Sequence, residues 1–112
     1  MLIVEDEETL GGTLRDLLEV EGYEVELATN GADALGRIAR GRPDVVLLDF
    51  MLPIADGAEV LRRLAAEGVA GARVIVMTSA ARESLGDAKY DHFLAKPFRL
   101  DAVLRLIAGG GA

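Results

Sequence analysis

Polar side chains of complementary kinds stand directly after four short apolar runs of the sequence. Carboxylates follow the first two runs, hydroxyls follow the third and an amine follows the fourth. Such a set can hold a divalent metal ion on its oxygens and can use one carboxylate as a nucleophile toward a phosphoryl group. The runs and the polar residues after them are Leu2 to Val4 with Glu5 and Asp6, Val45 to Leu48 with Asp49, Val74 to Met77 with Thr78 and Ser79, and Phe93 to Ala95 with Lys96.

The four apolar runs predict strands that are buried on both faces. They are rich in β-branched and aliphatic residues without polar alternation, which is typical of a parallel sheet. A fifth segment, Tyr23 to Ala28, alternates Val25 and Leu27 with Glu24 and Glu26. That alternation indicates a half-exposed edge strand. We therefore expect five strands.

Apolar residues at helical spacing separate these strands and place one apolar stripe on each predicted helix. Glycines mark the helix ends, with Gly22 after the first, Asn30-Gly31 before the second and Gly41 at its end. Alternating strands and helices predict a doubly wound α/β fold, with a five-stranded parallel sheet and helices on both faces. The stripes are Leu10, Leu14, Leu17 and Leu18; Ala34, Leu35, Ile38 and Ala39; Val60, Leu61 and Leu64; and Leu100, Val103, Leu104 and Ile107.

Ligands of doubly wound folds lie at the carboxyl ends of the strands, so the polar residues after the runs are expected to meet in one pocket. Glu5, Asp6 and Asp49 within about 5 Å would repel by roughly 3 kcal/mol per pair at an effective dielectric near 20. A divalent cation relieves this repulsion, and oxygen ligands at an open site favour Mg²⁺ or Mn²⁺. Asp49 is then the candidate nucleophile, with Lys96 and Thr78 stabilising the phosphoryl group.

Together these motifs resemble the response-regulator receiver domains of bacterial two-component signalling, phosphoacceptor domains with a flavodoxin-like fold. The resemblance implies that Asp49 takes a phosphoryl group from a histidine kinase or a histidine phosphotransfer protein. It also implies that Glu5, Asp6, Asp49 and the backbone carbonyl of Met51 hold Mg²⁺. The resemblance covers essentially the whole chain and is carried by Glu5-Asp6, by Leu47 to Pro53 with Asp56-Gly57, by Met77-Thr78-Ser79 and by Lys96-Pro97-Phe98.

The same resemblance implies a switch. Lys96 would contact the phosphoryl group across a cis peptide to Pro97, Thr78 would turn inward, and Phe93 would follow it. The reshaped surface would bind an effector protein or an output domain. Phosphorylation-dependent dimerisation is a further expectation. A receiver assists its own phosphorylation and dephosphorylation but is not otherwise an enzyme.

One stretch departs from the family pattern. The sequence between Thr78 and Lys96 is about one helical turn shorter than usual. Within Ala81 to Lys89, Leu85 is the single large apolar residue and Gly86 interrupts a helix. We expect a short, tilted or disordered helix after the fourth strand.

Composition limits the remaining possibilities. With 112 residues, 51% of them apolar, the chain fits one domain, which we assign to residues 1–108 with a tail or linker stub over 109–112. The net charge of -7 argues against direct nucleic-acid binding, and cysteines are absent. No apolar run reaches the roughly 20 residues that span a bilayer, so a cytoplasmic protein without membrane contact is expected.

Structural interpretations compete with the functional ones. Asp49 suits a turn, Glu5 and Asp6 suit the start of a helix, and Lys96 suits an exposed turn. Thr78 could satisfy a backbone group, and Phe93 could simply be a core residue. Two other function classes also fit the motifs: a pseudo-receiver that binds partners without being phosphorylated, and a Mg²⁺-dependent phosphatase with Asp49 as nucleophile.

Overall fold

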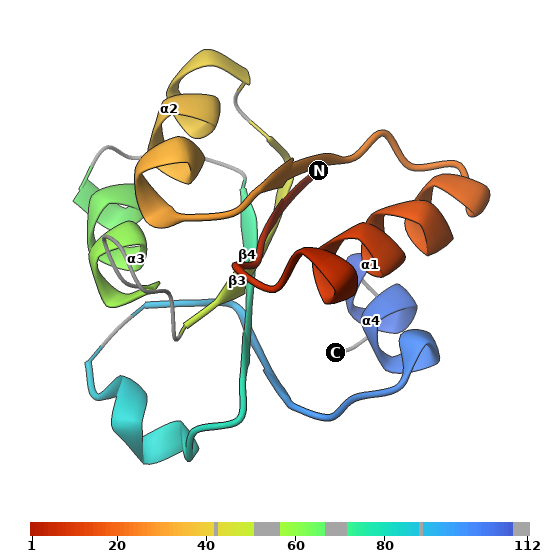
Figure 1. Cartoon of the computed structure of the whole chain (residues 1–112). Helices are drawn as coiled ribbons and strands as arrows, with labels where there is room; N and C mark the ends of the chain where they lie inside the picture. The colour runs from red at the N-terminus through yellow and green to blue at the C-terminus, as the bar shows by residue number, and fades with distance from the viewer. Residues whose placement is uncertain (42, 51–56, 67–71, 88, 109–112) are drawn as a thin grey trace.

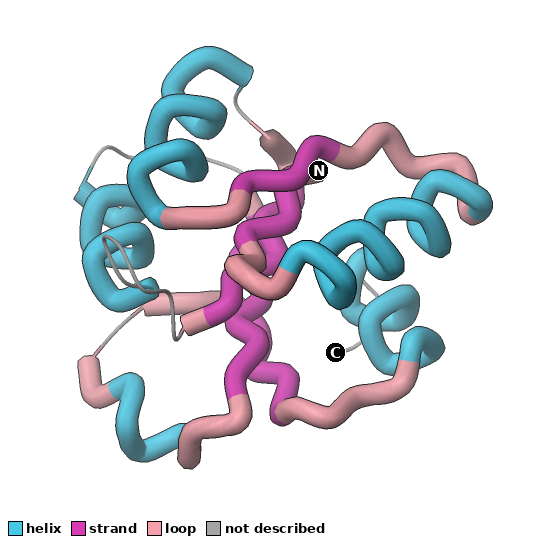
Figure 2. Tube along the Cα trace, viewed as in Figure 1, coloured by secondary structure: helices cyan, strands magenta, loops and turns pink. Residues whose placement is uncertain are grey.

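A computed structural model describes residues 1–41, 43–50, 57–66, 72–87 and 89–108. Within them, five parallel strands form one sheet in the order β2-β1-β3-β4-β5, which confirms the predicted five-stranded parallel sheet. Figure 2 shows this sheet as a central column with helices on both sides. The strands are β1 (Leu2–Val4), β2 (Glu26–Ala28), β3 (Val45–Asp49), β4 (Arg73–Thr78) and β5 (His92–Ala95); the helices are α1 (Glu8–Val20), α2 (Gly31–Gly41), α3 (Gly57–Ala66), the 3₁₀ helix η1 (Arg82–Leu85) and α4 (Leu100–Ile107).

Two apolar clusters, one on each face of the sheet, form the core. Figure 1 shows α2 and α3 covering one face and α1 and α4 covering the other. Alternate strand residues point to opposite faces, so Val46 and Leu48 pack in the cluster under α2 and α3. Leu47, between them, packs in the cluster under α1 and α4. All three are fully buried, which confirms that this central strand is covered on both faces.

The predicted helix boundaries are largely confirmed. Gly22 follows α1 with a φ of 96°, a conformation that favours glycine. Asn30 caps α2, because its Oδ1 accepts a hydrogen bond from the Asp33 N–H at 2.8 Å. Gly68, expected to end the third helix, lies outside the described residues.

Two of the predicted apolar stripes include residues that the structure exposes to solvent. Leu17 on α1 is 40% exposed, and Ala39 on α2 is also exposed. The buried side of α1 runs instead through Gly11, Leu14 and Leu18. Gly11 lies where α1 comes close to β2, since a Cβ there would be 2.8 Å from Leu27 Cδ1, and Leu17 lies outside this buried line.

The prediction of burial on both faces is wrong for β5. Phe93 and Leu94 are only partly buried and Ala95 is exposed, because β5 pairs with β4 alone and forms one edge of the sheet. At the other edge, β2 is shorter than the predicted Tyr23 to Ala28, although Val25 and Leu27 face the core as expected.

The segment after β4 contains the short helix that its sequence predicts. Its single turn, η1, buries Leu85 to 5% exposure and ends at Gly86, which has a φ of 55°. No helix in the described part of the chain combines the length and the apolar character needed to cross a membrane.

Candidate functional site

Backbone hydrogen bonds hold the candidate residues at the carboxyl edge of the sheet. The Glu5 N–H donates to the Ala28 carbonyl at 3.0 Å, and the Lys96 N–H donates to the Thr78 carbonyl at 2.9 Å. These bonds continue the strand ladders for one residue beyond β1 and β5. Asp49 and Thr78 are themselves the last residues of β3 and β4 rather than the residues after them.

A close backbone approach fixes the start of α3 relative to Asp49. The Gly57 N–H donates to the Phe50 carbonyl at 3.1 Å. A Cβ on Gly57 would overlap the backbone of Phe50, so another residue type could not sit there without moving that backbone. Gly57 therefore anchors α3 against the residue that follows Asp49.

Three carboxylates meet at this edge, as the spacing of the motifs predicts. One oxygen from each of Glu5, Asp6 and Asp49 lies within 4.8 Å of the others. Glu5 is fully buried, Asp49 is 4% exposed and Asp6 is exposed. The cluster thus has a buried base and one side open to solvent, which a hydrated ion needs.

The Lys96 side chain reaches into the cluster from the end of β5. Its Nζ donates to Glu5 Oε1 at 2.7 Å and to Asp49 Oδ2 at 3.3 Å. The side chain is 21% exposed, so one positive charge lies between two nearly buried carboxylates. The Lys96-Pro97 peptide is cis, as predicted.

The acid-base properties of the cluster follow from its burial. Burial raises the pKa of Glu5 to about 8, the neighbouring Asp49 carboxyl adds to the rise, and Lys96 offsets only part of it. Burial lowers the pKa of Lys96, but its hydrogen bond to Glu5 and the charges of Asp49 and Glu5 outweigh this, so that pKa lies above its usual value. The carboxylates therefore lack sufficient positive charge nearby.

The donor set fits a hard divalent cation. Glu5 Oε2 is buried and has no hydrogen-bond partner among the residues that the structure describes. When all of them are ionised, as they would be around a bound cation, three carboxylates and one ammonium carry a formal charge of -2, which one Mg²⁺ would neutralise. Oxygen ligands alone, with an open side for water, suit Mg²⁺ better than softer metals. Met51, whose carbonyl is the fourth predicted ligand, lies outside the described residues.

Thr78 and Phe93 lie on the same face of the sheet. In the β4–β5 register, Val76 is opposite Phe93 and Thr78 is opposite Ala95. Because alternate residues share a face, Thr78 points to the same side as Val76 and Phe93. Thr78 is fully buried, and its Oγ1 accepts a hydrogen bond from the Ala80 N–H at 3.0 Å. The hydroxyl thus satisfies a backbone group in this conformation.

One neighbour of Phe93 was not predicted from the sequence. The Arg82 guanidinium lies over the Phe93 ring, with its Cζ 5.0 Å from the ring centroid. The Tyr90 ring also approaches, at a centroid distance of 6.5 Å. An arginine in a short polar segment gives no sequence signal for this contact, because the fold alone brings η1 beside β5.

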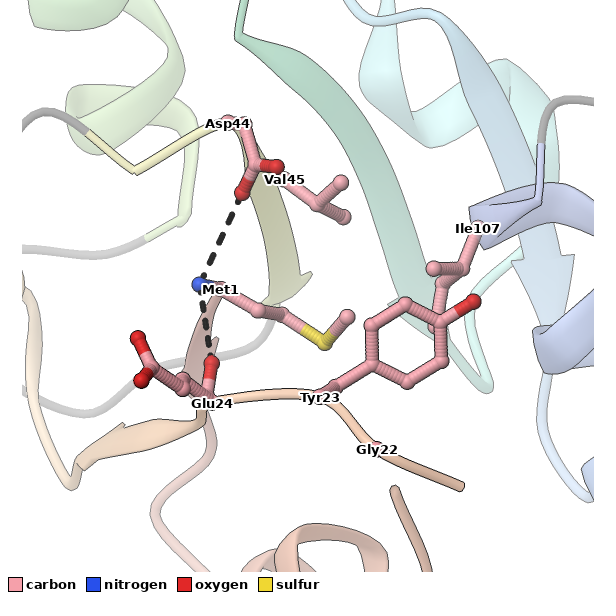
Figure 3. A pocket seen from close by; sticks show the side chains of 7 residues that line it. All are labelled: Met1, Gly22, Tyr23, Glu24, Asp44, Val45 and Ile107. Atoms are coloured by element: carbon pink, nitrogen blue, oxygen red, sulfur yellow. Dashed lines mark hydrogen bonds and ion pairs between the residues drawn. The ribbon is translucent and has the colours of Figure 1, made fainter. Parts of the chain in front are cut away.

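A separate pocket lies at the amino ends of the strands. Figure 3 shows the Met1 ammonium near Asp44 and the Glu24 carbonyl, at 3.6 and 3.1 Å. The cavity measures about 270 Å³, and Tyr23, Val45 and Ile107 also line it. Of the described residues that line it, only Glu24 and Asp44 are acidic, and ligands of this fold class bind at the opposite ends of the strands. The carboxyl edge is therefore the better candidate site.

Comparison with known proteins agrees with this geometry. The family model described as the response regulator receiver domain matches residues 1–108. The response regulator MprA of Mycobacterium sp. (strain KMS) is 42% identical over 110 residues, which cover 93% of this chain and 46% of that protein. The chain thus spans about half the length of the curated relatives it matches.

Solved structures give the same result. Response regulator TrrA from Thermotoga maritima, in complex with Mg²⁺-BeF, is similar with a TM-score of 0.87 and 30% identity, covering 96% of this chain and 95% of that one. The receiver domain of sensor histidine kinase PA1611 from Pseudomonas aeruginosa, with magnesium in its active site cleft, is similar with a TM-score of 0.88 and 31% identity, covering 96% and 93%. This chain belongs to the response regulator receiver domain family of two-component signalling.

Proposed function

We propose that Asp49 is the phosphoacceptor and that its donor is a histidine kinase or a histidine phosphotransfer protein. The observation that carries this proposal is the junction of Glu5, Asp6 and Asp49 oxygens within 4.8 Å, with Lys96 Nζ 3.3 Å from Asp49 Oδ2. Asp49 is the member of this cluster that lies at the end of a central strand and contacts the lysine without being fully enclosed.

The proposed reaction moves one phosphoryl group. An Asp49 carboxylate oxygen attacks phosphorus while the bond from phosphorus to the donor imidazole nitrogen breaks. The electron pair of that bond stays on the nitrogen and the other nitrogen of the donor ring carries a proton, so the products are an aspartyl phosphate and a neutral imidazole. Lys96 stabilises the charge on the phosphoryl oxygens. Thr78 supplies a hydroxyl hydrogen bond after its own hydrogen bond from Ala80 is released.

Glu5, Asp6 and Asp49 would hold Mg²⁺, or Mn²⁺, together with the Met51 carbonyl. The bound ion would neutralise charge on the phosphoryl oxygens. The buried Glu5 Oε2 without a described partner supports this, since an unpaired buried carboxylate oxygen is costly. The magnesium that the related TrrA and PA1611 structures contain is further support.

The consequence of phosphorylation is proposed to be a change at Thr78 and Phe93 that a downstream partner reads. Because the curated relatives are about twice as long as this chain, an output domain is one candidate partner and a separate effector protein is another. Residues 1–108 would form the receiver unit, with 109–112 as tail or linker. We propose that the phosphoryl transfer takes place in the cytoplasm. Dimerisation of the phosphorylated protein is a further outcome to be measured.

Phosphorylation by a small-molecule donor tests the assignment. Acetyl phosphate with Mg²⁺ should add one acid-stable, base-labile phosphoryl group, seen by intact mass, and Asp49→Asn should abolish it. Asp44→Asn is the matched control, since Asp44 precedes the other end of the same strand and is exposed. Labelling that persists in Asp49→Asn, or that is unchanged when Mg²⁺ is chelated, would contradict the proposal. Absence of labelling in the unchanged chain would favour a pseudo-receiver.

A further inference from the structure

Three contacts hold the segment that follows β4 against the end of the sheet. At its start, the Ala80 N–H donates to Thr78 Oγ1 at 3.0 Å. In the middle, Arg82 lies over the Phe93 ring. At its end, Leu85 is buried in the cluster under α2 and α3. The segment thus connects a proposed reacting group on β4 with an aromatic ring on β5.

The contact between Arg82 and Phe93 has the geometry of a cation–aromatic interaction. Its distance of 5.0 Å from guanidinium carbon to ring centroid lies inside the range of about 6 Å over which the ring quadrupole attracts a cation. Phe93 has no hydroxyl that could tie it elsewhere by a hydrogen bond, and it is only partly buried. Its ring position therefore depends on its neighbours, which include the charged Arg82.

We propose that Arg82 is a positioning residue that ties the Phe93 ring to η1, so that ring and helix move together. The proposal rests on the proposed function, because it takes Thr78 as the group that responds to phosphorylated Asp49. When the Thr78 hydroxyl turns toward a phosphoryl group, it releases the Ala80 N–H, and η1 loses its first contact. Arg82 then couples the displacement of η1 to Phe93.

A double-mutant cycle on the unphosphorylated protein tests the contact itself. Ser84 N–H donates to Ala81 O at 2.9 Å and Gly86 N–H donates to Glu83 O at 3.2 Å, so exchange of these two amides reports the opening of η1. Arg82→Met keeps the aliphatic stem and removes the cation. Because an exposed cation–aromatic contact is weak, the exchange rates should rise about two- to fivefold.

Phe93→Leu should produce a similar rise, and the double variant should add little to either single change, since both remove one contact. Effects of the two substitutions that simply multiply would overturn the proposal. Arg82→Lys, which keeps a cation, should restore part of the protection. Arg62→Met is the control, because Arg62 pairs with Glu59 on α3 and should leave η1 exchange unchanged.

A second measurement asks whether the contact couples the two elements. Beryllofluoride with Mg²⁺ serves as the phosphoryl analogue, and NMR follows the Phe93 ring and the Ser84 and Gly86 amides. In the unchanged protein both sets of signals should shift. In Arg82→Met the amides should still shift while the shift of the ring falls by at least half, and a ring shift of full size would refute the coupling.

The two proposals fail in different ways. If beryllofluoride leaves Phe93 and η1 unchanged in the parent protein, the switch part of the proposed function is wrong. The exchange cycle without the analogue still decides whether Arg82 holds Phe93 to η1. If instead the parent responds and the cycle shows independent effects, the switch stands and Arg82 has no part in it.

Discussion

The site residues at the ends of the central strands are more deeply buried than those at the β5 edge of the sheet. Glu5, Asp49 and Thr78, at the ends of β1, β3 and β4, are 0%, 4% and 0% exposed. Phe93 and Lys96, in and after β5, are only partly buried. Three of the groups proposed to bind metal and phosphoryl thus lie in the best-packed region, whereas Lys96 and the aromatic proposed to respond lie at a sheet edge.

This difference indicates which part of the domain can move without disturbing the metal ligands. Local opening free energies are smallest where few apolar contacts are buried, so β5 and η1 should open more easily than β3. A response confined to that edge leaves the metal ligands in place. The comparison predicts measurable differences between matched substitutions in the two regions.

The largest expected difference is in core packing. Leu47→Ala in β3 should destabilise the protein by about 2–5 kcal/mol, because it opens a cavity in a fully buried two-sided strand. Leu94→Ala in β5 should cost less than half as much, since water reaches part of that side chain already. Urea unfolding of both variants measures this, and equal losses would mean that β5 is as tightly held as β3.

A smaller effect is expected at the junction between Asp49 and α3. Gly57→Ala forces a methyl group against the Phe50 backbone and should destabilise by about 1–3 kcal/mol. Gly12→Ala on α1 is the matched control, because only the tip of Arg15 comes within 4.0 Å of the added methyl. It should stabilise the protein by up to about 1 kcal/mol through helix propensity. Thermal unfolding that ranks the two variants in the opposite order would contradict the close approach.

The smallest effect concerns charge in the site. Without Mg²⁺ and at pH 9, where Glu5 with its pKa of about 8 is ionised, Asp49→Asn should stabilise the fold by about 1 kcal/mol, since it removes a buried like charge beside Glu5 while giving up part of the Lys96 pairing. Mg²⁺ at ten times its Kd should stabilise the parent by about 1.4 kcal/mol and the variant much less. The two melting temperatures with and without Mg²⁺ check this. An equal shift in both proteins would place the metal elsewhere.

The sequence was informative where residues are buried and strand ends converge. Uninterrupted apolar runs located β1, β3 and β4, because a two-sided strand has no polar alternation. The rule that parallel strands present their carboxyl ends at one edge of a sheet then predicts that Glu5, Asp49 and Lys96 share one pocket. Site and fold could be predicted together because one topology controls both.

The features that the sequence did not predict depend on which other helices and strands pack beside a given element. Periodicity assigns Leu17 to an apolar stripe but does not say how far neighbouring elements cover α1. The run from Phe93 to Ala95 reads as two-sided, yet the strand order leaves it at an edge. The close approach of Gly57 to Phe50 and the stacking of Arg82 likewise arise from tertiary geometry, which a local pattern does not contain.

The ion pair between Lys96 and Glu5 joins residues that lie 91 positions apart in a chain of 112. During synthesis, both acidic residues after β1 and the acid at the end of β3 leave the ribosome long before the lysine does. Contacts between residues so far apart in sequence raise the contact order of a fold, which slows folding. Lys96 is therefore the last of these groups to be synthesised, and a growing chain carries its carboxylates without the amine that balances them.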